Sequence, residues 1–377
     1  MDQVGPLGLY VHVPFCQAIC DYCNFTRGLR DDALMQAYVE ALVVEIARAG
    51  DGAPADTVFF GGGTPSLLEP QAVGRVLGAL RRAFRIAPGA EISLEANPES
   101  ASPDRLIGYR AAGVNRLSLG VQSFLDAELV RLGRLHSAEA ARAAMRAARA
   151  AGFDNVSLDL MLWLPGQSMA DWRTSVEALV AIEPDHVSCY LLELYPGAPI
   201  RETMARARWT LAPDDDAAAM YRWGVERLET AGYRQYEISN LAKPDRRCRH
   251  NLKYWSDGEW LGFGCGAHST RAAARWRNLS DTSAYVDTIR AGRSPAVERR
   301  ELAPDERIGE AAFTGLRLSA GLDLEAMRCR YGVDLEQRYG DQLRPFVDEG
   351  FLVREGARLR LSRDGMLISN EIMQVFV

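Results

Sequence analysis

The sequence predicts an α/β protein: a parallel sheet curled into a partial (β/α)6 barrel, followed by a small C-terminal winged-helix-like domain. Six short β-rich runs alternate with helical patterns in the first half of the chain, the order that right-handed crossovers produce. Polar and apolar residues alternate within several of these runs, whereas a sheet covered by helices on both faces has continuously apolar strands. Near residue 300 the pattern changes to helices followed by a hairpin.

The elements can be placed in order along the chain. Strands are expected at 9–13, 57–60, 91–96, 116–121, 155–161 and 186–193, with helices over 34–50 and 71–84 after the first two. Farther on we expect a helix over 212–232, a strand at 235–239, an aromatic and glycine-rich segment at 250–269, helices over 305–321 and 335–350, and a hairpin at 351–362. The predicted domains are 1–200 for the partial barrel, 201–299 for an extension of it and 300–377 for the C-terminal domain.

The parity of side chains along the strands predicts where a ligand binds. Because successive side chains point to opposite faces, "EISLEAN" places Ser93, Glu95 and Asn97 on one face, and "NVSLDLM" places Ser157 and Asp159 together. A polar inner face with helices only outside indicates a lumen that holds a polar ligand. The exposed face of an antiparallel sheet would also alternate, but it fits poorly with the intervening helices.

Composition restricts the location and the partners. The chain has 377 residues with 44 Lys+Arg against 50 Asp+Glu, so no general electrostatic attraction to nucleic acid or anionic lipid is expected. It lacks the basic start and apolar run of a secretory signal, and no stretch approaches the roughly 18 apolar residues of a membrane helix. We therefore expect a cytoplasmic protein with no integral membrane segment.

Three of the seven cysteines form a cluster in "HVPFCQAICDYC", directly after the first strand. Cys16, Cys20 and Cys23 therefore lie at a strand's carboxyl end, where barrel proteins build their sites. An odd cysteine count in a long chain favours reduced thiols and a metal site over disulfides. Three thiolates can hold three irons of a [4Fe-4S] cluster and leave one iron open. A zinc site would need a fourth ligand, from Cys248 or His250, and buried cysteines without a metal are a further alternative.

A run of glycines follows the second strand in "FFGGGTPS". Without Cβ atoms, Gly61, Gly62 and Gly63 let the backbone approach a ligand closely. Alone they would indicate only a tight turn, but they are expected at the same end of the sheet as the cysteines.

Together these motifs resemble the radical S-adenosylmethionine (SAM) superfamily, in the branch that contains oxygen-independent coproporphyrinogen III oxidases and HemW-type haem chaperones. The resemblance covers nearly the whole chain, including "RLSLGVQSF", "YEISN", "HNLKYW" and "GAHS". It implies a TIM-like radical SAM barrel, a [4Fe-4S] cluster on the three clustered cysteines and SAM on the open iron.

The positions that match the superfamily's SAM contacts are Tyr10, Tyr22, Gly62, Gly63, Thr64, Glu95, Gln122, Arg134 and Asp159. Carboxylates suit ribose hydroxyls and the sulfonium charge, Arg134 suits the SAM carboxylate, and Tyr22 offers an apolar face to adenine. Taken singly, Glu95 and Asp159 have the alternative of being ordinary buried carboxylates, and Arg134 that of a solvated charge at a helix end; together, on strands of matching parity, these alternatives lose weight.

Two departures from the coproporphyrinogen oxidases match the haem chaperones. Phe25 stands where those oxidases carry a further cysteine, and only 15 residues precede Cys16. The "HNxxYW" motif of the chaperones is present from His250 to Trp255. Because neutral imidazole is a standard haem ligand, the resemblance makes His250 a candidate ligand for haem as cargo. Cys248 is either a second ligand or a packed thiol.

The other four histidines receive no ligand assignment: His12, His136, His186 and His268. His12 is nevertheless expected to support the site.

Three functions follow as hypotheses. The first is a haem chaperone that binds haem and passes it to client haemoproteins. The second is an enzyme that removes propionate carboxyl groups of coproporphyrinogen III by radical oxidative decarboxylation. The third is a DNA-binding regulator, but the arginines at 354, 358, 360 and 363 are offset by nearby carboxylates. Whether the chain is an enzyme, and whether it forms a homodimer, is left open.

Overall fold

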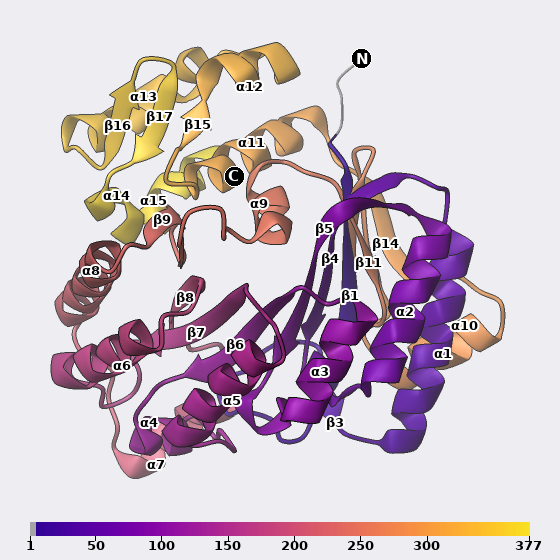
Figure 1. Cartoon of the computed structure of the whole chain (residues 1–377). Helices are drawn as coiled ribbons and strands as arrows, with labels where there is room; N and C mark the ends of the chain where they lie inside the picture. The colour runs from indigo at the N-terminus through magenta and orange to yellow at the C-terminus, as the bar shows by residue number, and fades with distance from the viewer. Residues whose placement is uncertain (1–4) are drawn as a thin grey trace.

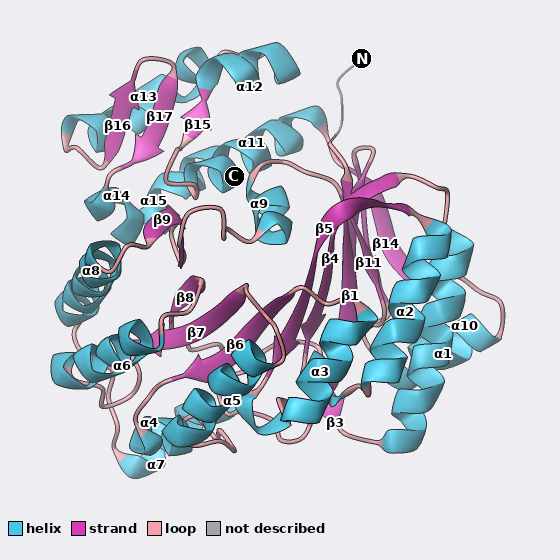
Figure 2. Cartoon of the chain, in the orientation of Figure 1, coloured by secondary structure: helices cyan, strands magenta, loops and turns pink. Residues whose placement is uncertain are grey.

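The computed structural model describes residues 5–377 and confirms the predicted α/β class. Residues 1–4, which the predicted first domain includes, lie outside the described residues. Six parallel strands lie side by side in chain order and coincide with the six predicted ones (Figures 1 and 2). They are β1 (Leu7–Val13), β4 (Pro54–Gly62), β5 (Arg85–Ala96), β6 (Arg116–Gln122), β7 (Val156–Leu162) and β8 (His186–Leu191).

Helices connect these strands and cover the outer face of the curved sheet (Figure 2). They are α1 (Asp32–Ala49), α2 (Pro70–Ala83), α3 (Pro103–Ala112), α4 (Asp126–Arg131), α5 (Ala138–Ala150) and α6 (Met169–Ile182). Several begin at side-chain caps: Asp31 accepts from the Leu34 amide and Ser137 from the Ala140 amide. Such caps satisfy amide groups that the first helical turn leaves unpaired.

The alternation along the strands explains why helices lie only outside. On β6, Leu117, Leu119 and Val121 are fully buried in the apolar core, and burying such side chains stabilises the fold by roughly 1.5–3 kcal/mol each. Ser118, on the opposite parity, lines an inner cavity together with Glu95 and Asp159. The predicted polar lumen is therefore confirmed at these positions.

Both edges of the sheet carry strands beyond the six. On one edge β8 is followed by β10 (Asn240–Ala242) and β9 (Arg234–Glu237), after α7 (Pro199–Ala207) and α8 (Asp214–Thr230). On the other, β11 (Trp260–Phe263) pairs in parallel with β1. Antiparallel strands β12 (His268–Arg271), β13 (Ala274–Asn278) and β14 (Ala296–Glu301) follow, with α10 (Thr282–Arg290) between the last two. Sequence analysis missed this second edge because its strands are short and irregular.

The C-terminal domain has the predicted winged-helix-like order and lies at the end of the sheet where β1 begins (Figure 1). Its elements are α11 (Pro304–Leu316), β15 (Leu322–Asp323), α12 (Leu324–Tyr331), α13 (Leu335–Asp348), the hairpin β16 (Leu352–Glu355) and β17 (Arg358–Leu361), α14 (Arg363–Leu367) and α15 (Ser369–Met373). The three-part domain division remains a prediction, and its boundaries fall within α7 and β14.

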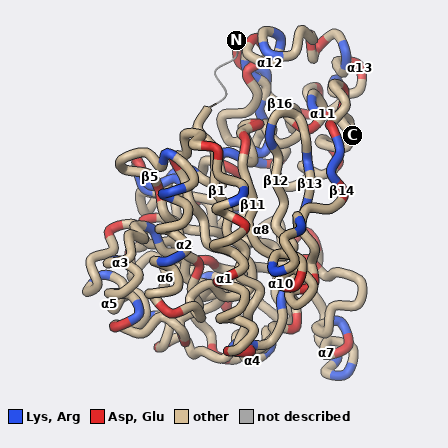
Figure 3. The backbone as a smooth tube through the Cα atoms, turned by 90° about the vertical axis from the view of Figure 1, so that its right-hand side faces the viewer, with Lys and Arg blue, Asp and Glu red and all other residues tan. Residues whose placement is uncertain are grey.

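Charges of both signs are interspersed along the chain (Figure 3). The four arginines behind the DNA-binding hypothesis are each paired with a carboxylate, at Glu336, Asp323, Glu355 and Glu229. These pairs leave little positive charge for a phosphate backbone to meet. Among residues 5–377, no helix has the length and apolarity needed to cross a membrane.

Tyr38 of α1 connects the first strand, β1, to the segment that follows β11. Its buried hydroxyl donates to the His12 carbonyl at 2.8 Å and accepts from the Cys265 amide at 3.0 Å. We expect Tyr38→Phe to lower the free energy of unfolding by about 1–3 kcal/mol, because a buried donor and acceptor lose their partner. Urea denaturation measures the difference. Tyr195→Phe, at a half-exposed tyrosine, is the control, and an equal effect of both variants would contradict the assignment.

Candidate functional site

The three clustered cysteines line one cavity of about 370 Å³ at the carboxyl ends of the parallel strands. Cys16 ends the short strand β2 (Phe15–Cys16), which pairs with β3 (Gly28–Leu29). Cys20 and Cys23 lie in the loop between these two strands, where the Cys23 amide donates to the Cys20 carbonyl at 3.2 Å. The predicted convergence of the cysteines is therefore present in the folded chain.

The glycine run forms the adjoining wall, next to the cysteine loop. A Cβ on Gly63 would lie 3.0 Å from the Cys16 sulfur and 2.9 Å from the Phe15 carbonyl oxygen. Gly62 has φ +119°, and a Cβ there would lie 2.6 Å from the His12 ring. Only glycine allows the backbone to pass so close to the cysteine loop. Thr64 completes this wall with its hydroxyl 3.7 Å from the Cys16 sulfur.

Arg134 connects the cysteine loop to the sheet. One terminal nitrogen donates to the Cys20 sulfur at 3.4 Å, and the other donates to the Asn97 side chain and the Gly120 carbonyl at 2.8 and 2.7 Å. Its buried Nε has no hydrogen-bond partner within residues 5–377. A buried guanidinium with one unused donor is suited to bind a carboxylate.

Two carboxyl groups line the lumen, Glu95 from β5 and Asp159 from β7, with β6 between them. Burial raises the pKa of Glu95 to about 8, and the charge of Asp159 adds to this shift. Burial also raises the pKa of Asp159, opposed first by its hydrogen bond from Ser188. Glu95 accepts from the Gly62 amide at 3.2 Å and so links this pair to the glycine wall. The pair offers acceptors for hydroxyl groups and a site for a cation.

The donor set fits a [4Fe-4S] cluster with SAM beside it. The cavity lining includes all three cysteines and eight of the predicted SAM positions, which are Tyr22, Gly62, Gly63, Thr64, Glu95, Gln122, Arg134 and Asp159. Across residues 5–377, no three His, Cys, Asp or Glu side chains converge tightly enough to hold a single metal ion. A cluster does not require such convergence, because each cysteine binds a different iron.

The alternative zinc site is not assembled in this structure. Neither proposed fourth ligand lines the cysteine cavity. Cys248 is fully buried with its sulfur 3.6 Å from a Glu91 oxygen, and burial raises the pKa of its thiol to about 12. Of its two predicted roles, second ligand or packed thiol, the burial and the Glu91 contact favour the packed thiol.

Tyr10, the ninth predicted SAM position, lines a second and deeper cavity of about 210 Å³. Its hydroxyl lies 3.0 Å from His12 Nδ1, which supports the expected auxiliary role of His12. The two cavities share the side chains of Glu95, Ser118, Asp159 and Tyr190. Tyr10 therefore faces the lumen behind the acid pair and not the cysteines.

His250 also lines this deeper cavity, and both of its ring nitrogens are engaged. Nδ1 lies 2.8 Å from the Thr57 hydroxyl, and Nε2 lies 2.9 Å from the Tyr254 hydroxyl. The ring is fully buried and stacks on Phe59 at 5.2 Å. Burial lowers the pKa of His250 to about 3, with Lys253 and Arg116 contributing. The imidazole is neutral, as a haem ligand requires, but in this conformation it has no free nitrogen for iron.

The sequence-based prediction missed the wall formed by the ends of β7 and β8 and by the segment that follows β8. Met161, Tyr190, Leu192, Glu193 and Tyr195 line the cysteine cavity. The signal for them was their place at and after the carboxyl ends of β7 and β8, which is where the other site residues lie.

Comparison with known proteins agrees with this geometry. Residues 10–179 match the family model described as radical SAM superfamily, and residues 302–368 match the HemN C-terminal domain. The chain is 34% identical to "Heme chaperone HemW" of Bacillus subtilis, over 98% of each chain, and 37% identical to that of Mycobacterium tuberculosis, over 99% of this chain and 95% of the relative. The Escherichia coli protein of the same name is 34% identical over the full length of both.

This chain is a HemW-family radical SAM protein. The solved structure of coproporphyrinogen III oxidase (HemN) from Escherichia coli superposes with a TM-score of 0.86 at 24% identity, covering 98% of this chain and 90% of that one. That likeness supports the fold of this HemW-family protein, including the C-terminal domain, and leaves its activity to other evidence.

For Arg134 we expect substitution by alanine to weaken SAM binding by about 10- to 100-fold, since a charge-assisted contact to a carboxylate is lost. Calorimetry on anaerobically reconstituted protein measures the affinity. Arg131→Ala is the matched control, because Arg131 contacts the Pro165 carbonyl and Trp209 and does not line the cavity. Equal SAM affinity of wild type and Arg134→Ala would contradict this role.

For Glu95 we expect a pH-dependent effect on the stability of the cofactor-free protein. Its raised pKa means that the folded state retains a proton that the unfolded chain releases above about pH 4.3. Stability is therefore lost as pH rises toward about 8. The free energy of unfolding of Glu95→Gln should exceed that of wild type by about 1–3 kcal/mol between pH 5 and 8, with the difference increasing as pH rises. Urea denaturation across this range tests it, and a difference independent of pH would refute it.

Proposed function

We propose that this chain is a cytoplasmic haem chaperone that binds a [4Fe-4S] cluster and SAM, binds haem, and transfers haem to client haemoproteins. The observation that carries the cofactor assignment is the single cavity in which three thiols, the glycine wall and the unused Arg134 donor meet. Identity above 30% over nearly the full length with proteins named "Heme chaperone HemW" supports haem as the cargo.

In this proposal Cys16, Cys20 and Cys23 hold the cluster. With SAM, a bound cluster supplies one-electron chemistry. Burial raises the pKa of the Cys16 and Cys23 thiols, so both must release a proton when they bind iron.

The remaining side chains would orient SAM. Arg134 would pair with the SAM carboxylate, and the Glu95 and Asp159 pair would accept hydrogen bonds from ribose hydroxyls. Tyr22 belongs to an apolar cluster with Leu132 and Met161, which would keep water from the adenine side of the cavity.

The competing proposal is radical oxidative decarboxylation of coproporphyrinogen III. Phe25 lines the cysteine cavity and is 62% exposed at the position where those oxidases carry a further cysteine. It presents an apolar ring there and no sulfur. At this position the chain matches the haem chaperones and departs from the oxidases, which favours transport over turnover.

The cofactor part of the proposal predicts a colour and an iron content. We expect protein reconstituted anaerobically with iron and sulfide to be brown and to contain about four irons, because the cluster is [4Fe-4S]. Cys20→Ser should lose most of this iron, whereas Cys329→Ser, at an exposed cysteine outside the cavity, should keep it. Iron and sulfide analysis and absorption spectra measure both. Colourless wild-type protein, or protein that takes up zinc instead, would refute the assignment.

The cargo part is tested by a haem titration followed by a transfer assay. Wild-type protein should develop a Soret band on titration and then lose it to an added haem-free haemoprotein. A parallel incubation with coproporphyrinogen III, SAM and a reductant tests for protoporphyrinogen. Porphyrin turnover without haem retention would replace the chaperone proposal by the enzyme.

A further inference from the structure

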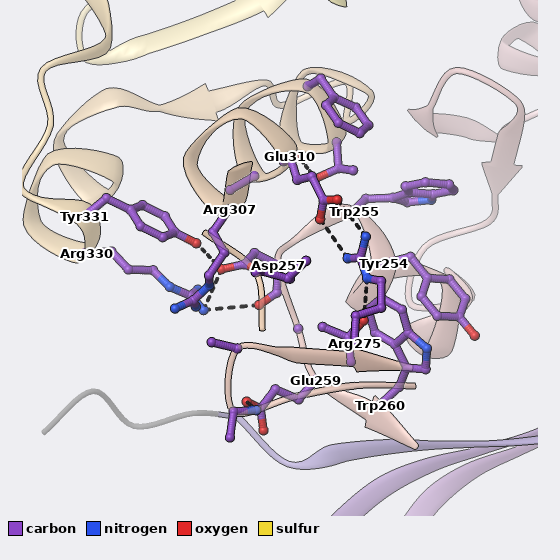
Figure 4. Close-up of a pocket in the computed structure, with 18 of the residues that line it drawn as sticks. Tyr254, Trp255, Asp257, Glu259, Trp260, Arg275, Arg307, Glu310, Arg330 and Tyr331 are labelled. Carbon is purple, nitrogen blue, oxygen red and sulfur yellow. Dashed lines mark hydrogen bonds and ion pairs between the residues drawn. The ribbon is translucent and has the colours of Figure 1, made fainter. Parts of the chain in front are cut away.

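A third cavity, of about 630 Å³, lies between the sheet edge and the C-terminal domain (Figure 4). Its floor comes from α9 (Arg249–Trp255), β11 and β12, and its other wall comes from α11 and α12. None of the cluster cysteines lines it. Tyr254 lines both this cavity and the deeper cavity of the lumen. We call it the interdomain pocket.

Aromatic rings form much of the interdomain pocket. Tyr254 and Trp260 meet edge to face with their ring centroids 4.7 Å apart, and Trp255 lies beside Tyr254 at 6.3 Å. Phe313 and Tyr331 contribute from the C-terminal domain. Flat apolar surfaces of this kind suit a large planar ligand, and the volume lies in the usual range for cofactor sites, about 300–1,000 Å³.

His268 is the one histidine of five whose ring has a free nitrogen. The other four each have both ring nitrogens in hydrogen bonds: His12 with Tyr10 and Thr26, His136 with Glu99 and Val121, His186 with Ser157 and Tyr236, and His250 with Thr57 and Tyr254. Within residues 5–377 the His268 imidazole makes no hydrogen bond. His268 is exposed and lines the interdomain pocket.

The strand places the His268 ring toward the pocket. The next residue, Ser269, is buried and accepts from the Gly262 amide at 2.9 Å on the other face. The His268 carbonyl accepts from the Trp260 indole at 3.0 Å, which holds the two residues side by side. Burial and then the charges of Arg277 and Arg275 lower the pKa of His268. At neutral pH its imidazole therefore keeps the lone pair that a metal ligand needs.

The charged groups of the pocket leave one cation unpaired. Arg275 makes a two-pronged pair with Glu310 at 2.6 and 2.7 Å, and Arg330 pairs with Asp257 at 2.7 Å. Within the described chain, Arg307 makes no ion pair and lies with its guanidinium 5.8 Å from the Tyr331 ring centre. Figure 4 shows these side chains around the pocket.

Glu259 also lines the pocket, where its carboxylate accepts a hydrogen bond from the Ala272 amide. It is a further acidic group in the lining.

We propose that haem docks in the interdomain pocket, with His268 as an axial ligand of the iron and Arg307 pairing with a propionate. The proposal rests on the proposed function, because haem is the cargo assumed there. It revises the sequence-based expectation, which assigned the iron to His250 and gave His268 no role. It also places the haem at the other end of the lumen from the cluster, with Tyr254 and His250 between the two sites.

The first test is haem titration of the full-length protein, with electron paramagnetic resonance to identify the axial ligand. We expect His268→Ala to weaken haem binding about 10- to 100-fold and to lose the imidazole signature. Added imidazole should restore that signature, which a purely structural role of His268 would not predict. His250→Gln, in the neighbouring cavity of the lumen and outside the interdomain pocket, is the comparison variant and should keep the wild-type spectrum.

The second test concerns the propionate contact. Arg307→Gln should weaken haem binding by roughly threefold to tenfold. Arg338→Gln, on α13 and paired with Asp305 outside the pocket, should leave binding unchanged.

The outcomes separate the two levels of the hypothesis. If wild type and His268→Ala bind haem with equal affinity and the same spectrum, the pocket assignment is overturned while the chaperone proposal stands. If loss of the imidazole signature follows His250→Gln instead, the assignment is overturned in favour of that residue. If wild-type protein binds no haem, both proposals fail.

Discussion

The polarity of the two faces of each parallel strand is the constraint on which the structure depends. Side chains such as Leu117, Leu119 and Val121 must be removed from water, so helices cover the outer face. The inner parity carries Glu95, Ser118 and Asp159, which cannot be buried against a helix without partners. The sheet therefore curves around a polar lumen, and the lumen is where the cofactor chemistry can be placed.

The cysteine site results from two features: the parallel strands end at one edge of the sheet, and the backbone of the glycine run approaches the cysteine loop closely. Parallel strands end at the same edge, so loops far apart in the sequence meet there. The glycine run passes so close to the cysteine loop that a Cβ on Gly63 would lie only 3.0 Å from the Cys16 sulfur. Arg134 then joins the loop to the sheet through Cys20, Asn97 and Gly120, and its unused donor marks the place for an anionic group.

Hydrogen-bond satisfaction distinguishes the histidines more sharply than their sequence context does. Four imidazoles are held at both nitrogens and contribute to the internal polar network, where an unpaired group would be costly. His268 lies on the short strand β12, between β11 and β13, and its side chain is exposed to solvent and belongs to no such network. The lumen and the interdomain pocket meet at Tyr254, which connects the cluster end of the fold to the C-terminal domain.

The sequence by itself determined the six parallel strands, the polar lumen and the convergence of the cysteine loop with the glycine run, because period-two alternation and strand-end motifs are local signals. The further SAM positions followed from the family resemblance, and lining residues such as Met161 and Tyr190 were found only in the structure. It also indicated the C-terminal domain from its helix and hairpin patterns. Only the tertiary structure decided which side chains keep free donors or lone pairs, since these depend on partners distant in the chain, such as Thr57 for His250. The edge strands β11 to β14 and the interdomain pocket were likewise decided there, because β11 joins the sheet beside β1 across about two-thirds of the chain, and no local pattern encodes that pairing.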